Sequence, residues 1–235
     1  MTRITISTRD GQMEAYTAVP ATSPMAAIIV LQEAFGVTRY IESVADRLAR
    51  EGYFAIAPAL FHRSGSPVLD YTDIAAVRPH MQAMTGEGIR MDLDAVMAEL
   101  AHRGFERSRI GAIGFCMGGS LALYVATYCA IGASVGFYGG GVTEGRLGLP
   151  SLRELAEDLQ VPWLGLYGDL DHGIPVDDVE QLRAVLDRVD VPTKIVRYPD
   201  AGHGFHCHDR PKAFHQQSAS AGWAVALEWF TRYLA

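Results

Sequence analysis

Residues 109–120 read RIGAIGFCMGGS, and this stretch contains the turn that decides the fold. The apolar run RIGAIGF is typical of a buried strand, and the apolar segment after Cys116 is typical of a buried helix. Gly114 and Gly118 stand two residues before and two after Cys116, which is the spacing of a nucleophile elbow between a strand and a helix. So tight a turn strains its central residue and requires small neighbours. We therefore expect Cys116 to project above the carboxyl edge of a sheet, where open α/β sheets bind ligands.

Two other glycine motifs do not fit this stretch. A phosphate-binding loop would need a lysine after Gly119, but Ser120 stands there. The dinucleotide-binding pattern G-x-G-x-x-G is also absent, so we expect no cofactor. The alternative for Cys116 is a small buried hydrophobic residue, the ordinary role of a free cysteine.

Short apolar runs alternate with longer amphipathic segments along the chain, which predicts a mostly parallel sheet with helices on both faces. The first two runs flank Asp10-Gly11, a favourable hairpin turn, and should add antiparallel strands at one edge. Residues 60–85 contain Gly65, Pro67 and Pro79 and are expected to be a long irregular excursion. Because no repeat or linker is visible, we expect one domain over residues 1–235. Strands are expected at 2–7, 13–19, 26–32, 53–59, 109–115, 132–140, 161–168 and 193–199, and helices around 41–48, 89–100, after Cys116, at about 175–189 and at the C-terminal end.

Composition narrows the class of protein. The formal net charge is −7 over 235 residues, which argues against nucleic acid as a partner because phosphate binding needs a basic surface. No apolar run is long enough to span a membrane, and no signal peptide is visible at the N-terminus. The three cysteines (Cys116, Cys129 and Cys207) form no paired framework. We therefore expect free thiols, with Cys129 in the core, and a cytoplasmic location.

Candidate partners for Cys116 follow two later strands. Asp169 and Asp171 come after the strand ending at Gly168, and His203 comes after the strand predicted at 193–199. Nucleophile, acid and histidine therefore occur in the chain order of α/β-hydrolases, each beyond the carboxyl end of a strand. This arrangement predicts nucleophilic catalysis more strongly than the elbow does alone.

The chain resembles the dienelactone hydrolase family, the carboxymethylenebutenolidases, along nearly its whole length. The resemblance implies a single-domain α/β-hydrolase with a cysteine nucleophile that cleaves esters, in particular the enol-lactone of dienelactones formed in catechol breakdown. It implies a triad of Cys116, Asp171 and His203, with Asp169 as the alternative acid. The matching segments are QEAFGV (32–37), GFCMGG (114–119), YGDLDHGIP (167–175) and AGHGFHCHDR (201–210).

The same resemblance implies roles around the thiol. Glu33 would meet the resting thiol of Cys116 and move away when substrate arrives; the alternative is an ordinary loop carboxylate or helix-start residue. A helix N-terminus and a nearby His203 should both favour the thiolate. The backbone N–H of Met117, and by resemblance that of Ala34, would form the oxyanion hole.

Substrate-binding residues are expected around this centre. In the family, arginines bind a substrate carboxylate, one of them four residues after the catalytic histidine. That position here is Cys207, so Arg78 and Arg210 are the candidates. Phe35, Tyr138 and Phe205 are candidate pocket walls, with ordinary packing as the alternative.

No metal site is expected. His203, His206, Cys207 and His208 crowd together, but no second Cys/His pair completes a zinc site, and His206 and His208 are interpreted as polar loop residues. The favoured function is therefore hydrolysis of a small ester or lactone, and the candidate arginines imply a substrate that bears a carboxylate. The alternatives are a hydrolase of other esters or thioesters with the same triad, and a non-catalytic binding module on the same scaffold.

Overall fold

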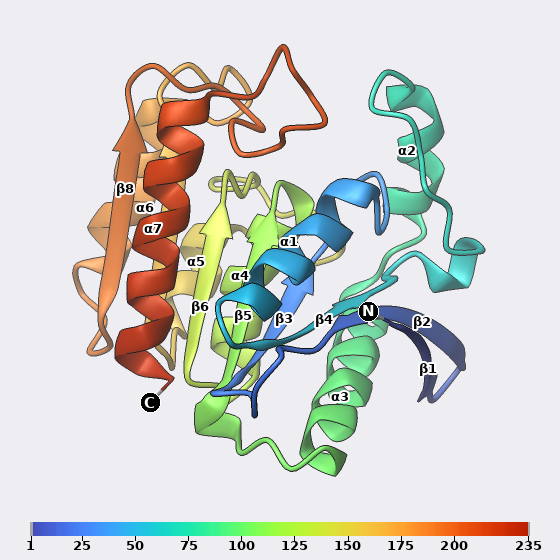
Figure 1. Ribbon diagram of the computed structural model, residues 1–235. Helices are drawn as coiled ribbons and strands as arrows, with labels where there is room; N and C mark the ends of the chain where they lie inside the picture. Colours follow the sequence, from blue (N-terminus) through green and yellow to red (C-terminus); the bar gives the residue numbers. More distant parts are fainter. Residues whose placement is uncertain (1, 235) are drawn as a thin grey trace.

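The computed structural model describes residues 2–234, and an eight-stranded sheet runs through it (Figure 1). The strand order is β1-β2-β4-β3-β5-β6-β7-β8. Strands from β4 to β8 pair in parallel, whereas β2 pairs antiparallel with β1 and with β4. The predicted mostly parallel sheet with an antiparallel hairpin at one edge is confirmed. The strands are β1 (Thr2–Thr8), β2 (Gly11–Ala18), β3 (Ala27–Leu31), β4 (Phe54–Pro58), β5 (Ile110–Phe115), β6 (Ala133–Phe137), β7 (Trp163–Gly168) and β8 (Thr193–Tyr198).

Burial explains the composition of the strands. Every residue of β3, β4, β5, β6 and β7 is buried, as expected for strands covered by helices on both faces.

The hairpin turn lies one residue earlier than predicted, because Thr8 pairs with Gly11 and leaves Arg9 and Asp10 as the loop. The one-domain prediction over 1–235 stays a prediction, and residues 1 and 235 lie outside the described part.

Helices cover both faces of the sheet. In Figure 1, α1 (Arg39–Arg50) and α7 (Gln216–Tyr233) lie in front of the sheet. Behind it lie α4 (Met117–Tyr128), α5 (Leu152–Glu157) and α6 (Val176–Leu186), while α3 (Gly86–His102) packs against β1. No helix within residues 2–234 combines the length and apolarity needed to cross a membrane.

The excursion over residues 60–85 is more regular than predicted. It contains the short helix η1 (His62–Ser64) and the helix α2 (Ile74–Gln82), which stands apart from the sheet in Figure 1. The side chain of Asp73 caps α2 by accepting a hydrogen bond from the N–H of Ala76 at 3.0 Å. Pro79 lies inside this helix, so proline was misleading as a sign of irregular backbone. The short helices α5 and η2 (Arg107–Arg109) were also not predicted.

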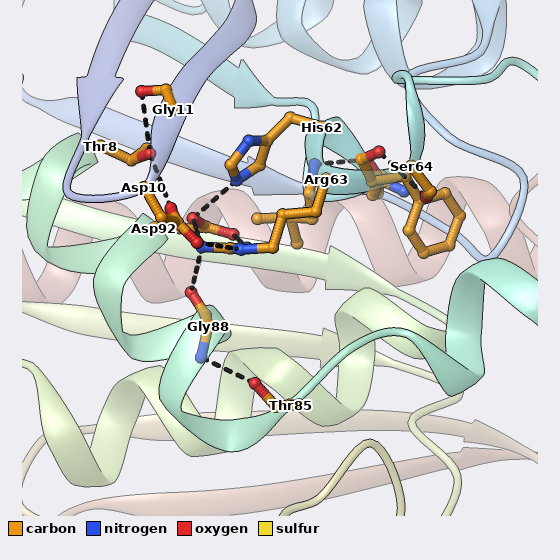
Figure 2. Close-up of polar contacts among 12 residues, drawn as sticks. Thr8, Asp10, Gly11, His62, Arg63, Ser64, Thr85, Gly88 and Asp92 are labelled. Carbon is orange, nitrogen blue, oxygen red and sulfur yellow. Dashed lines mark hydrogen bonds and ion pairs between the residues drawn. The ribbon is translucent and has the colours of Figure 1, made fainter.

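A partly buried ionic cluster anchors the beginning of the excursion (Figure 2). Both terminal nitrogens of the Arg63 guanidinium donate to the Asp92 carboxylate of α3, at 2.8 and 2.9 Å. Arg63 also bonds to Asp10 in the β1–β2 turn, and His62 lies 2.9 Å from the same Asp92 carboxylate. The cluster therefore ties η1 to the hairpin and to α3.

Candidate active site

Cys116 occupies a strained elbow between β5 and α4. Its backbone has φ 54° and ψ −114°, outside the usual regions for a residue with a side chain. A Cβ on Gly114 would lie 1.8 Å from the carbonyl oxygen of Gly118, and one on Gly118 would lie 2.2 Å from that of Leu31. The elbow therefore requires both glycines.

The structure brings Cys116, His203 and Asp171 together. Nε2 of His203 lies 3.1 Å from Sγ of Cys116, and Nδ1 lies 2.6 Å from Oδ2 of Asp171. The other oxygen of Asp171 accepts a hydrogen bond from the N–H of Gly173 at 2.9 Å. Asp171 is almost fully buried, so its carboxylate is held in one orientation toward the imidazole.

Asp169 has a different set of contacts. Two nitrogens of Arg197 bind its carboxylate at 2.8 Å each, and Arg197 also bonds to Glu180 of α6. This geometry makes Asp169 part of an ion pair between the β7 loop and β8. Of the two candidate acids, only Asp171 is within hydrogen-bonding distance of His203 in the described structure.

The electrostatics of the histidine follow from these contacts. Burial lowers the pKa of His203, but hydrogen bonds to Asp171 and Cys116 outweigh it and raise the pKa to about 10. At neutral pH the folded protein therefore favours an imidazolium between a carboxylate and a sulfur atom. The sulfur of Cys116 therefore faces a positively charged ring at 3.1 Å.

Two backbone N–H groups could stabilise an oxyanion. Ala34 and Met117 both line the cavity that contains Cys116. Met117 is the first residue of α4, whose N–H has no partner within the helix. Within residues 2–234, neither N–H donates a hydrogen bond to a protein acceptor. Both predicted donors are therefore available to a bound oxygen.

Glu33 is fully buried beside this centre. Its Oε2 accepts a hydrogen bond from the hydroxyl of Tyr71 at 3.1 Å, while Oε1 has no partner among the described residues. Burial raises the pKa of Glu33, and the nearby Arg210 guanidinium and the Tyr71 hydroxyl oppose that rise. In this structure the carboxyl group of Glu33 is bonded to Tyr71, and the thiol of Cys116 faces His203.

A cavity of about 430 Å³ opens over the sulfur of Cys116. Arg210 lines it, with its guanidinium over the rings of Phe35 and Tyr71 at 5.8 and 5.5 Å. Arg78 does not line this cavity; it is exposed on α2 and lines a neighbouring hollow. The second guanidinium of the cavity comes from Arg146, which the sequence did not single out because it lies in an irregular loop.

The three aromatic candidates differ in position. Phe35 lines the cavity. Tyr138 is buried and lies edge-on to the His203 ring, with centroids 5.1 Å apart, but it does not line the cavity. Phe205 was wrong as a pocket wall: it is fully buried against Tyr138 and Tyr198, and so it packs beneath the histidine loop.

His206 was also misinterpreted as a polar loop residue. Its ring is buried and stacks between Phe115 and Trp223, and Nδ1 lies 2.7 Å from the Tyr40 hydroxyl. Burial, together with the nearby charge of Arg47, lowers the pKa of His206 to about 3, so the ring is neutral. It fastens the loop that carries His203 to α1 and α7. His208, by contrast, is exposed beside Asp209 as predicted.

One group of side chains has the geometry of a metal site, but an arginine already binds its carboxylates. Asp10, His62 and Asp92 offer ligand atoms within 4.8 Å of one another, and no other such group occurs in residues 2–234. Arg63 already bonds to both carboxylates, however, and its fixed positive charge opposes a cation there (Figure 2). This cluster is therefore better explained as a structural anchor.

The fold and the site define an α/β-hydrolase, with nucleophile, histidine and acid at the carboxyl edge of the sheet. A family model described as "Dienelactone hydrolase family" matches residues 13–234. The chain therefore belongs to the dienelactone hydrolase family and is a hydrolase of that type.

Related proteins align with nearly the whole length of this chain. A Salmonella typhimurium protein named "Putative carboxymethylenebutenolidase" is 40% identical over 233 residues, covering 97% of this chain and 86% of that protein. One of the same name from Escherichia coli O157:H7 is 39% identical, covering 97% of this chain and 85% of its own length. A crystal structure titled as a putative dienelactone hydrolase from Klebsiella pneumoniae superimposes with a TM-score of 0.90 at 36% identity, covering 99% and 98% of the two chains.

Proposed function

We propose that this protein hydrolyses a small carboxylic ester or lactone through a thioester on Cys116. The observation that carries the proposal is the line of contacts from sulfur to carboxylate, 3.1 Å from Cys116 to His203 and 2.6 Å from His203 to Asp171. The nucleophile is then the Cys116 thiolate, formed when the thiol proton passes to Nε2 of His203 at 3.1 Å.

The first half-reaction forms the thioester. The Cys116 thiolate adds to the ester carbonyl carbon, and the oxyanion that forms accepts hydrogen bonds from the N–H groups of Ala34 and Met117. When the carbon–oxygen bond breaks, the imidazolium of His203 gives its proton to the leaving oxygen. The alcohol departs, and His203 is left neutral beside the acyl-enzyme.

The second half-reaction releases the acid. Neutral His203 takes a proton from a water molecule, and the hydroxide adds to the thioester carbonyl. The carbon–sulfur bond breaks, and the thiolate and imidazolium pair is restored. Asp171 keeps Nε2 of the imidazole directed at the sulfur, and it stabilises the positive charge of the ring in both steps.

We further propose that Glu33 limits reactions of the idle thiol. Its carboxyl group is buried next to the oxyanion donor Ala34, and one of its oxygens lacks a partner. A negative charge brought to the sulfur would favour the unreactive protonated thiol. Hydrogen bonding to Tyr71 keeps the carboxyl away while the thiol faces His203.

We propose that a carboxylate of the substrate binds an arginine of the cavity. Neither Arg146 nor Arg210 forms an ion pair among the described residues, although both line the cavity. A guanidinium can grip a carboxylate through two parallel hydrogen bonds and so fix the carbonyl over the sulfur. Arg210 is the stronger candidate because aromatic rings already hold it.

The test compares a matched pair of esters that differ only by a free or methylated second carboxyl group. Arg210→Ala should lower kcat/KM for the acid about tenfold or more and leave the methylated ester nearly unchanged. Arg188→Ala, at an exposed position outside the cavity, is the matched control. If Arg210→Ala and Arg146→Ala both leave the preference unchanged, the cavity has no carboxylate subsite.

Hydrolysis of thioesters with the same groups is the second candidate, since the attack on sulfur-linked and oxygen-linked carbonyls uses the same residues. Turnover of matched oxygen and sulfur esters separates the two.

Cys116, Cys129 and Cys207 are all unpaired, which supports a reducing compartment such as the cytoplasm for the reaction.

A further inference from the structure

The helix α2 presents an apolar face to the catalytic cavity. Ile74, Val77 and Met81 stand at positions i, i+3 and i+7 and therefore share one side of the helix. All three line the cavity above Cys116, together with Leu147 from the loop after β6. This face is therefore directed at the site and not at the main core.

A second hollow lies beside the cavity, next to the apolar face of α2. This hollow has a volume of about 460 Å³ and shares five lining residues with the cavity. Most of these shared residues are apolar. They are Ile74, Val77, Met81, Arg146 and Leu147.

Exposure at this wall is unusual for its residue types. The side chain of Ile74 is 63% exposed, one of few large apolar side chains in residues 2–234 left so open. Val77, one turn further along, is buried in a small separate core with Phe35 and Met117. An apolar ligand portion lying along α2 would cover Ile74 and extend this small core.

The cavity over Cys116 and the hollow beside it offer more space than a compact lactone ring fills. Each of the two hollows, at about 460 and about 430 Å³, is already within the range for sites that bind drug-sized ligands. We infer that the substrate is an ester with an extended apolar arm, which lies along Ile74 and Met81 while its carbonyl sits over Cys116. This inference rests on the proposed esterase function and adds the shape of the substrate.

A chain-length series tests it. The probes are p-nitrophenyl esters from acetate to octanoate, which lengthen the acyl arm, and alkyl acetates from ethyl to octyl, which lengthen the alcohol arm. In at least one series kcat/KM should rise about twofold to fourfold for each methylene beyond the third, because each is removed from water along α2.

Two single substitutions test whether the apolar face of α2 causes the chain-length dependence of kcat/KM. Ile74→Ser should flatten the rising series, which is read as the ratio of kcat/KM for each longer ester to that for the acetate in the same variant. Val68→Ser is the matched control, since Val68 is 61% exposed on the same excursion and lines neither hollow. Because Ile74 is itself exposed, its replacement should not endanger folding.

Flat kcat/KM in both series would overturn the inference, as would equal effects of Ile74→Ser and Val68→Ser. Failure of the proposed function looks different. It would appear as acetate hydrolysis that survives Cys116→Ala, whatever the chain-length dependence.

Discussion

Replacement of Asp171 by asparagine is the change that best tests the arrangement of the triad. The His203 pKa rises from 6.5 to about 10, a difference worth roughly 5 kcal/mol of preference for the imidazolium. Asp171 and Cys116 supply this preference against the cost of burial. If the carboxylate supplies about half of it, asparagine should lower the His203 pKa by about one to two units.

The rate should fall further than this charge effect alone implies. An asparagine amide can donate to Nδ1 of His203 and so stabilise the wrong tautomer, which leaves Nε2 protonated in the neutral ring. We expect kcat to fall by about 10²-fold to 10⁴-fold for ester hydrolysis. Initial rates with a chromogenic ester give this number, and the imidazole resonances of His203 followed against pH give its pKa.

Asp169→Asn is the matched control, because it removes a carboxylate charge two residues away that bonds to Arg197 and not to His203. It breaks the ion pair with Arg197 at a partly exposed position, so the free energy of unfolding should fall by about 1 kcal/mol or less. Hydrolysis should proceed near the wild-type rate. A harmless Asp171→Asn combined with a damaging Asp169→Asn would refute the assignment of the acid.

Three further changes test the remaining parts of the site. His203→Ala should lower kcat by several orders of magnitude without unfolding the protein, and activity within tenfold of wild type would exclude it as the proton carrier. Glu33→Gln should speed iodoacetamide labelling of Cys116 at neutral pH, because it removes a negative charge from the surroundings of the thiol, and unchanged or slower labelling would contradict the limiting role. In that assay the other cysteines stay silent, since burial raises their pKa values to about 11 and about 12. Gly114→Ala should destabilise the fold by more than about 4 kcal/mol or prevent folding, since its Cβ would lie 1.8 Å from a backbone oxygen; a melting temperature near that of wild type would show that the elbow can relax.

The chain order of the glycine-flanked Cys116, Asp171 and His203 made much of the site predictable. Each of the three follows a fully or partly buried strand whose apolar run is recognisable, and parallel strands bring their carboxyl ends to one edge. The hairpin was predictable for a similar local reason, because Asp10 and Gly11 suit a tight turn.

The walls of the cavity were much harder to predict. The apolar positions of α2 face a cavity instead of a sheet, and Pro79 suggested irregular backbone, so the helix had no clear sign in the sequence. Arg146 lines the site from an irregular loop, where spacing carries no information. His206 looked polar, but aromatic rings and Tyr40 surround it, a tertiary arrangement that no local pattern encodes.

The central claim is that the acyl group passes through the sulfur of Cys116, and mass spectrometry of the rapidly quenched protein tests it most directly. After mixing with an activated ester, the wild-type protein should gain the mass of one acyl group on the peptide that contains Cys116. Cys116→Ala should show neither the adduct nor turnover while keeping its fold. Acylation of any other residue, or hydrolysis by Cys116→Ala at a near wild-type rate, would contradict the claim.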